Sequence, residues 1–370
     1  MALNVSTEAL NDRPIVGILS QETYIINKYF PDRKYDSFIQ ASYVKFLESA
    51  GARIIPIWIG QTEEYYRRVI NYTNGIMFPG GGTYFNETGG YGEAATHLYR
   101  IALEQNDKGT YYPIWGICLG MQALMYAALN GTEDIRVDCS SNNRVEALNF
   151  TLDQSTSRLF AQAPADIMEI LRNEKVTYNQ HRYCLTQEVL SDKNMLDDWR
   201  ILSTNQDENG LEFISSFEHK KVPFYGIQFH PEKNMFEFGR TSIPHSANSI
   251  RSSQYFANYF VNECRKNTNK FPNDEIESSS LIFNFNPEYI RNQSSITQIY
   301  LRVSEKRVSR RVDDVKQRPT TTLFEILLRI AIVSCIVHDQ YSWHNNGAGI
   351  IGGQSQNPFS KTEYSSSFPS

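Results

Sequence analysis

Residues 113–129 read PIWGICLGMQALMYAAL: a short apolar run, a Gly-x-Cys-x-Gly turn and a longer apolar segment. The run at 113–117 has the length of a buried strand, and 119–129 is apolar almost all round, as in a buried helix. A residue on such a strand–turn–helix bend is pushed out of the sheet edge, and flanking glycines avoid clashes there. Cys118 is therefore a candidate nucleophile, with the backbone N–H of Leu119 facing an incoming carbonyl oxygen. A buried core cysteine is the alternative interpretation.

Strand and helix patterns alternate through the first 130 or so residues. Strands are predicted at 15–19, 53–58, 75–78 and 113–117, and helices at 42–50, 63–72, 92–106 and 119–129. This alternation predicts an α/β fold in three layers, with a mostly parallel sheet flanked by helices. Residues 145–230 have the pattern of antiparallel strands that add to the sheet, and a closing helix is expected at 247–265.

Two further motifs could complete a site around Cys118. The run PGGG at 79–82 can turn backbone N–H groups into the same crevice, although alone it would be read as a flexible turn. His230 ends a predicted strand, and Glu232 would project to the same side of extended backbone. Glu232 could then orient His230 toward Cys118, as in a nucleophile–base–acid triad. A lone histidine at a strand end is more often a polar cap.

These motifs resemble those of the class I glutamine amidotransferase family. The three signatures occur in the family's order and spacing: FPGG at 78–81, WGICLGMQ at 115–122 and GIQFHPE at 226–232. A finer similarity is to γ-glutamyl hydrolases, carried by RPIVGIL at 13–19, ASYVKFLESAGA at 41–52, LNFT at 148–151, EFIS at 212–215 and HPEKN at 230–234. The resemblance covers about residues 13–301.

The resemblance implies a thiol hydrolase that cleaves γ-glutamyl bonds in folyl-poly-γ-glutamates or other γ-glutamyl peptides, without a cofactor or a metal. Cys118 would be the nucleophile, His230 the general base and then acid, and Glu232 the third member. The backbone N–H groups of Gly81 and Leu119 would stabilise the oxyanion.

The resemblance also implies substrate contacts. His181 matches the family's second functional histidine, whereas read alone it is a loop histidine near Cys184. The glycines on either side of Gly81, Gly80 and Gly82, would line the substrate site. A polyanionic substrate needs a local cationic patch in a chain of net charge −5, and Arg182 and Lys233 are the candidates.

Two other functions fit the motifs. A glutaminase subunit could supply ammonia to a separate synthetase, because the chain itself carries no synthetase or nucleotide-binding signature. A non-catalytic binding protein could keep the fold, although three intact motifs argue against this. Failure of Cys118 to react with iodoacetamide would favour the binding protein.

Composition sets broader limits. The 370 residues are 41% hydrophobic, enough for one large α/β domain, and no basic block in the first 300 residues predicts a nucleic-acid surface. The cysteines are odd in number and lack CxxC spacing, so the sequence predicts free thiols and neither a disulfide framework nor a zinc site. They are Cys118, Cys139, Cys184, Cys264 and Cys335.

Three segments are predicted: an N-terminal segment at 1–12, the hydrolase domain at 13–301 and an atypical, poorly ordered C-terminal extension at 302–370. The extension begins with a basic stretch and contains an apolar run at 323–337 that is too short for a membrane span.

The compartment is predicted from the resemblance alone. The first 14 residues lack the basic and apolar regions of a signal peptide, whereas the family resemblance implies a lysosomal, vacuolar or extracellular protein, and a homodimer. Chance alone gives roughly four Asn-x-Ser/Thr sequons in such a composition, so the number found does not establish secretion. The sequons are at Asn4, Asn71, Asn86, Asn130, Asn149 and Asn292.

Overall fold

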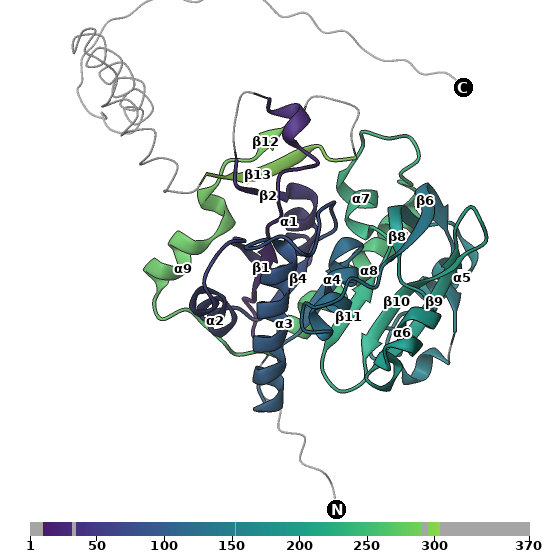
Figure 1. Cartoon of the computed structure of the whole chain (residues 1–370), viewed down its shortest axis with the longest axis horizontal. Coiled ribbons are helices and arrows are strands. Elements are labelled where there is room, and N and C mark those ends of the chain that lie inside the picture. Colours follow the sequence, from purple (N-terminus) through teal and green to yellow (C-terminus); the bar gives the residue numbers. More distant parts are fainter. Residues whose placement is uncertain (1–9, 32–34, 152, 291–294, 304–370) are drawn as a thin grey trace, which may run out of the picture. The chain divides into compact units, whose positions relative to one another are not determined.

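The centre of the fold is an eight-stranded sheet (Figure 1). The structure is a computed structural model that describes residues 10–31, 35–151, 153–290 and 295–303. The strand order is β3 (Arg53–Ile57), β1 (Ile15–Leu19), β4 (Gly75–Phe78), β5 (Ile114–Ile117), β11 (Phe224–Ile227), β10 (Glu212–His219), β9 (Trp199–Gln206) and β7 (Asn149–Phe150). Pairing is parallel from β3 to β11 and antiparallel from β11 to β7.

Helices pack on both faces of this sheet, which confirms the predicted three-layer α/β fold. One face carries α2 (Glu63–Tyr72), α3 (Tyr91–Asp107), α4 (Leu119–Ala128) and α6 (Gln187–Asp192). The other carries α1 (Ala41–Glu48), α5 (Ala165–Asn173), α7 (Pro231–Phe236) and α8 (Ala247–Cys264). Each face has its own apolar core, because a strand buried on both sides sends alternate side chains into two layers.

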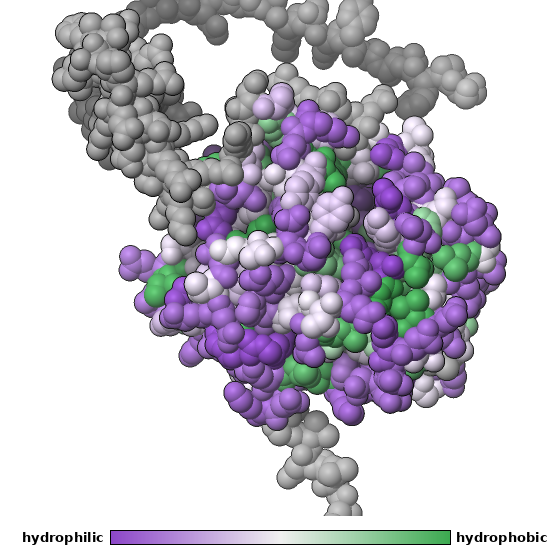
Figure 2. All heavy atoms as spheres, in the orientation of Figure 1, coloured by the Kyte–Doolittle hydropathy of each residue, from purple (hydrophilic) through white to green (hydrophobic). Residues whose placement is uncertain are grey.

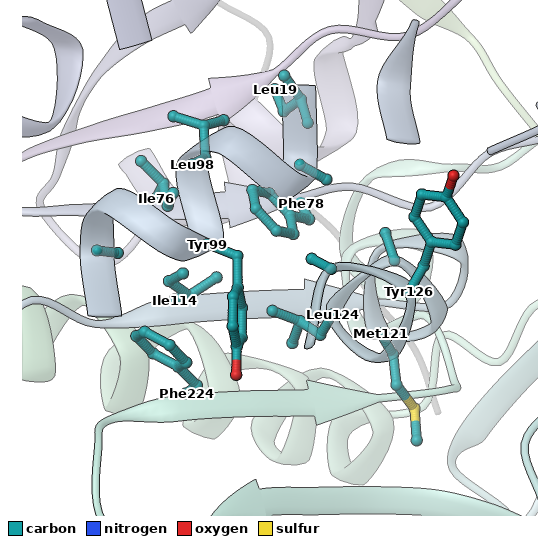
Figure 3. Close-up of a cluster of buried hydrophobic side chains, with 14 of the residues drawn as sticks. Leu19, Ile76, Phe78, Leu98, Tyr99, Ile114, Met121, Leu124, Tyr126 and Phe224 are labelled. Atoms are coloured by element: carbon teal, nitrogen blue, oxygen red, sulfur yellow. The ribbon is translucent and has the colours of Figure 1, made fainter. Parts of the chain in front are cut away.

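Strand β1 shows the alternation directly. Ile15 and Leu19 belong to the core under α2, α3 and α4, and Val16 and Ile18 belong to the core on the opposite face. Figure 3 shows the first of these cores, where side chains of α3 and α4 meet those of the central strands. Burial of this kind contributes about 1.5–3 kcal/mol for each large apolar side chain.

Two smaller sheets lie outside the central one. The first is β12 (Glu288–Tyr289), β13 (Gln298–Arg302) and β2 (Ser37–Gln40), and the second is the pair β6 (Val137–Glu146) and β8 (Thr177–Cys184). The sequence did not predict β6 or β8, because their many polar residues give no apolar alternation. The helix α9 (Asp274–Ser280) follows α8.

One strand prediction needs correction. The segment that becomes β11 was grouped with antiparallel strands, and it does pair antiparallel with β10. Its other edge pairs parallel with β5, so it is also the fifth strand of the parallel part of the sheet. A strand in the interior of a mixed sheet has two neighbours, and sequence periodicity does not determine the direction of either.

The surface is largely hydrophilic on the face that Figure 2 shows, with small hydrophobic areas among polar side chains. Among the helices that the structure describes, none is both long and apolar enough to cross a membrane. The apolar run at 323–337 lies outside the described residues, as do most of the predicted terminal segments. The division into three segments therefore stays a prediction.

Close packing of α4 on the sheet depends on Gly120. A Cβ atom at this position would overlap the carbonyl oxygen of Phe78, at the end of β4, and backbone cannot move aside as a flexible side chain can. We expect Gly120→Ala to lower the free energy of unfolding by about 3 kcal/mol. Urea denaturation followed by circular dichroism measures the change.

Gly210→Ala is the matched control. Gly210 has a positive φ of 85° but nothing within 4 Å of an added Cβ, so this substitution should cost only about 1 kcal/mol of backbone strain. Equal losses in the two variants would contradict a packing role for Gly120.

Candidate active site

Three loops meet at one edge of the sheet. The glycine run follows β4, Cys118 follows β5, and His230 comes three residues after the end of β11. These strands are neighbours in the parallel part of the sheet, and the carboxyl ends of parallel strands lie at the same edge. The topology therefore brings together three motifs that the sequence separates by up to about 150 residues.

Cys118 occupies a strained turn between β5 and α4. Its φ of 53° and ψ of −108° fall where a residue with a side chain rarely lies, and its N–H donates to the carbonyl of Ile227 at 2.8 Å. A Cβ on Gly116 would lie 2.6 Å from the carbonyl oxygen of Gly120, so both glycines of the motif are required by close backbone approach. The structure thus has the predicted elbow, and strain of this kind gathers at functional sites.

His230 and Glu232 form a buried pair. Nδ1 of His230 lies 2.8 Å from Oε1 of Glu232, and the Glu232 side chain is fully buried. The two side chains meet for a different reason from the one predicted. β11 ends at Ile227, His230 is the N-cap of α7, and Glu232 lies in the first turn of that helix. Extended backbone from His230 to Glu232 was therefore a wrong expectation, because Pro231 begins a helix as well as ending the extended segment.

The charges at this pair are coupled. Burial lowers the pKa of His230, but the charges of Glu232 and Cys118 and its hydrogen bonds to both outweigh burial and raise that pKa to about 9. Burial raises the pKa of Glu232, but the charge and hydrogen bond of His230, together with the charge of Lys233, hold it below its usual range. Near neutral pH the pair is therefore an imidazolium beside a carboxylate.

Tyr43 of α1 is a site residue that the sequence did not reveal. Its hydroxyl accepts the N–H of Gly80 at 2.9 Å and lies 3.3 Å from Nδ1 of His230. Burial and the charge of Glu232 raise the pKa of Tyr43 well above its usual value, so the hydroxyl keeps its proton. Tyr43 lies on the apolar face of its helix, and that pattern indicated only a core residue.

The glycine run after β4 is held by side-chain amides. Gln21 donates to the carbonyl of Gly80 at 3.0 Å and accepts the N–H of Gly82 at 3.3 Å. Among the described residues, no hydrogen bond is made by the N–H of Gly81 or of Leu119, the first residue of α4. These two N–H groups are therefore available to a ligand, as the predicted oxyanion site requires.

A cavity of about 490 Å³ opens above these residues. Cys118, His230, Gly81, Gly82 and His181 line it, whereas Gly80 and Glu232 lie behind the lining. Three cationic side chains also line it, and no aspartate or glutamate does among the described residues. The cations are Arg136, Arg182 and Lys233.

The three cations differ in how far their charge is neutralised. Arg136 pairs with Asp134 at 2.6 Å, and Nζ of Lys233 lies 3.9 Å from Glu232. Arg182 is exposed and has no carboxylate partner among the described residues. The sequence predicted Arg182 and Lys233 but missed Arg136. Arg136 lies just before β6, and it reaches the cavity because β6 pairs with β8.

The prediction of free thiols is wrong for two of the five cysteines. Cys139 of β6 and Cys184 of β8 form a disulfide, because the pairing of these strands brings together residues 45 positions apart. Cys118 and Cys264 are free and buried, and Cys335 lies outside the described residues. Sequence spacing did not reveal the bond because neither strand was predicted.

His181 lies beside this disulfide. Its Nδ1 is 3.4 Å from both sulfur atoms, and its Nε2 is 3.1 Å from Oδ1 of Asn179. Burial and the charge of His230 lower the pKa of His181 to about 3, which outweighs a backbone hydrogen bond with Tyr183. His181 therefore reaches the cavity as a neutral ring, and its predicted role in substrate contact stays a prediction.

A cysteine on a strand–turn–helix elbow, beside a histidine that a carboxylate holds, is the arrangement of a thiol hydrolase on an α/β fold. Comparison with known proteins agrees. The family model described as Peptidase C26 matches residues 14–232. The chain belongs to the peptidase C26 family, and it is a hydrolytic enzyme.

Several curated relatives match over most of their length. The chain is 33% identical to gamma-glutamyl hydrolase B of Dictyostelium discoideum, covering 88% of this chain and 93% of the relative. It is 37% identical to gamma-glutamyl hydrolase of Rattus norvegicus over 81% and 92% of the two chains. A solved structure from Thermoplasma acidophilum, described as a putative GMP synthase protein, aligns with 94% of its chain and 68% of this one at 14% identity and a TM-score of 0.37, a likeness that supports no statement about function.

The Glu232 carboxylate should set the charge of His230. Glu232→Gln removes the largest contribution that raises the pKa of His230, while burial still lowers it, so the pKa should fall clearly below its value of about 9. The signal of the His230 ring in an NMR titration measures this.

Glu237→Gln is the matched control. Glu237 is also buried, but it accepts a hydrogen bond from Thr297 rather than from His230. The pKa of His230 should stay near 9 in this variant. A value that is unchanged in Glu232→Gln would mean that the carboxylate does not control the imidazole.

Proposed function

We propose that this protein hydrolyses γ-glutamyl bonds in poly-γ-glutamates, including folyl-poly-γ-glutamates, with Cys118 as the nucleophile. The observation that carries this proposal is the Cys118–His230–Glu232 arrangement, in which Cys118 and His230 line a cavity that cationic side chains also line. The curated relatives that match over most of their length are named gamma-glutamyl hydrolases, which supports the same reaction.

The roles follow from the contacts. With Nδ1 of His230 on Glu232, Nε2 is the ring nitrogen left for Cys118, and the imidazolium places a positive charge beside the attacking sulfur. The thiolate attacks the γ-carbonyl carbon, and the N–H groups of Gly81 and Leu119, which make no hydrogen bond among the described residues, would stabilise the negative oxygen.

The remaining steps use one proton carrier. His230 donates its proton to the departing α-amine as the C–N bond breaks, which leaves a γ-glutamyl thioester on Cys118. The neutral imidazole then takes a proton from water, and the resulting hydroxide attacks the thioester. The C–S bond then breaks with the Cys118 thiolate as the leaving group, the γ-carboxyl group of the product gives its proton to solvent, and the thiolate–imidazolium pair is restored. Glu232 holds the ring in place throughout.

The cavity favours an anionic substrate over a neutral one. Each added glutamate of a poly-γ-glutamate carries an α-carboxylate, and Arg136, Arg182 and Lys233 are within the lining to receive such groups. Free glutamine has one carboxylate and would make fewer contacts with these cationic side chains. We therefore favour the hydrolase over the glutaminase subunit.

We also propose an oxidising compartment, lysosomal, vacuolar or extracellular. The Cys139–Cys184 disulfide supports this, because disulfides persist in such compartments and are rare in the cytosol. A homodimer stays a prediction from the family resemblance.

Hydrolysis of a folyl-poly-γ-glutamate tests the function and the nucleophile together. Wild-type protein should release glutamate or shortened folates, and Cys118→Ala should lower kcat by at least about 10⁴-fold. Chromatography of the products measures both. Cys264→Ala, which removes the other free thiol in the described chain, should keep most of the activity. Ammonia release from free glutamine without cleavage of the polymer would replace the proposal with the glutaminase.

The unpaired charge of Arg182 should contribute to substrate binding. Arg182→Gln should raise KM for a poly-γ-glutamate by about fivefold with kcat little changed, corresponding to about 1 kcal/mol of binding free energy. The difference should shrink in high salt, because exposed charges are screened. Lys221→Gln is the control: Lys221 is also exposed but pairs with Asp198 outside the cavity lining, so its removal should leave KM unchanged. An equal KM for wild type and Arg182→Gln would exclude this contact.

A further inference from the structure

The disulfide and His181 form a cluster of three potential metal ligands in the wall of the cavity. The sulfur atoms of Cys139 and Cys184 and a ring nitrogen of His181 all lie within 4.8 Å of one another. Cys184 and His181 are buried, whereas Cys139 is partly exposed and can be reached from solvent. The mechanism proposed above uses none of these sulfur atoms.

The hydrogen bonds around His181 fix which ring nitrogen faces the sulfurs. The Asn179 amide donates to the carbonyl of Thr177 at 3.0 Å, which turns its Oδ1 toward Nε2 of His181 at 3.1 Å. Nε2–H donates to this oxygen, so Nδ1 carries the lone pair and points at both sulfurs. A ring nitrogen held by a carbonyl on one side, with the other nitrogen free to coordinate, is the usual outer-shell arrangement of a metal-binding histidine.

The distances fit a tetrahedral zinc ion. Zn–S bonds of about 2.3 Å and Zn–N bonds of about 2.0 Å at tetrahedral angles place nitrogen and sulfur roughly 3.5 Å apart and two sulfurs roughly 3.8 Å apart. Both observed Nδ1–Sγ distances are 3.4 Å. Only the two sulfurs must separate, and with Cα atoms 5.9 Å apart this requires side-chain rotation rather than movement of the strands.

The local backbone suits such a site. The pairing of β6 with β8 shifts between Asp138 and Ser141, which places Cys139 in a bulge. Bulges re-aim side chains, and here the sulfur of Cys139 lies beside the sulfur of Cys184 and the ring of His181, both on β8. The three ligands thus come from two adjacent strands and are already assembled.

We propose that reduction of the Cys139–Cys184 disulfide converts this cluster into a Cys₂His zinc site with an open fourth position. A dithiol supplies two electrons and two protons, the disulfide becomes two thiols, and the dithiol closes to its own cyclic disulfide. Zinc then binds both sulfurs and Nδ1 of His181, and the two thiol protons pass to solvent. Zinc is the favoured metal because thiolate and imidazole are its preferred ligands.

The site would couple the redox state of the surroundings to the cavity. His181 lines the same cavity as Cys118 and His230, so a bound zinc ion would fix this ring and place an open coordination position at the wall, while the two thiolates balance the charge of the ion. We expect reduced, zinc-loaded protein to be less active than oxidised protein, and a chelator followed by reoxidation to restore the activity.

Zinc binding by the full chain tests the site independently of catalysis. The measurements use the Cys118→Ala background, because the catalytic thiol and His230 are themselves possible ligands. After reduction with dithiothreitol and removal of the reductant without air, this protein should bind about one zinc per chain. The triple variant that also carries Cys139→Ser and Cys184→Ser should bind less than about 0.2 per chain. Cobalt in place of zinc should give a sulfur-to-metal charge-transfer band that is lost in the triple variant.

Two further variants make the test sharp. Adding His181→Gln to the Cys118→Ala background keeps both thiols and should weaken zinc binding by at least about tenfold. Adding Cys264→Ala, in the buried core, should not change it. Circular dichroism of the reduced protein shows whether the fold survives. Reduced, folded protein that binds no zinc would overturn the proposal, as would equal binding by the triple variant or unfolding on reduction.

Discussion

The contact between α4 and the end of β4 determines the geometry of the site. Gly120 lies so close to the carbonyl of Phe78 that no side chain fits between them. This approach holds the start of α4 against the sheet, and the chain enters the helix through a turn in which Cys118 takes a positive φ. The sulfur is therefore held at the sheet edge by packing of the backbone, and strain at one residue is compensated by burial of almost every side chain of α4.

The order of the strands in the sheet brings His230 and Glu232 close to Cys118. β11 lies next to β5, so the loop after β11 ends beside the elbow. Pro231 then starts α7, and the tight first turn of that helix brings Glu232 under His230. Tyr43 connects this pair to the glycine run, since one hydroxyl contacts both His230 and Gly80. Residues from four separate segments are thus fixed relative to one another by buried hydrogen bonds.

Much of this could be predicted from the sequence because the central elements have clear patterns. The helix at 63–72 and the strands at 15–19 and 75–78 have the predicted bounds, and each is a regular apolar pattern bounded by polar or glycine residues. The roles of Tyr43 and Arg136 could not be predicted, because a tyrosine on an apolar helix face looks like a core residue and an arginine just before a polar strand looks like a surface residue. The disulfide was missed for the related reason that β6 and β8 have no apolar alternation, so nothing in the sequence indicated that Cys139 and Cys184 are neighbours.

Two buried histidines in the described cavity lining show how the hydrogen-bond partner of an imidazole ring determines its protonation state. Burial lowers the pKa of both His230 and His181, yet the first has a pKa of about 9 and the second of about 3. The difference lies in a carboxylate at 2.8 Å from His230 against an amide oxygen at 3.1 Å from His181. The charge of His230 further lowers the pKa of His181, so protonation of one ring opposes protonation of the other. At neutral pH the cavity therefore holds a proton donor beside Cys118 and, facing the sulfurs of Cys139 and Cys184, a neutral ring whose lone pair is free to bind.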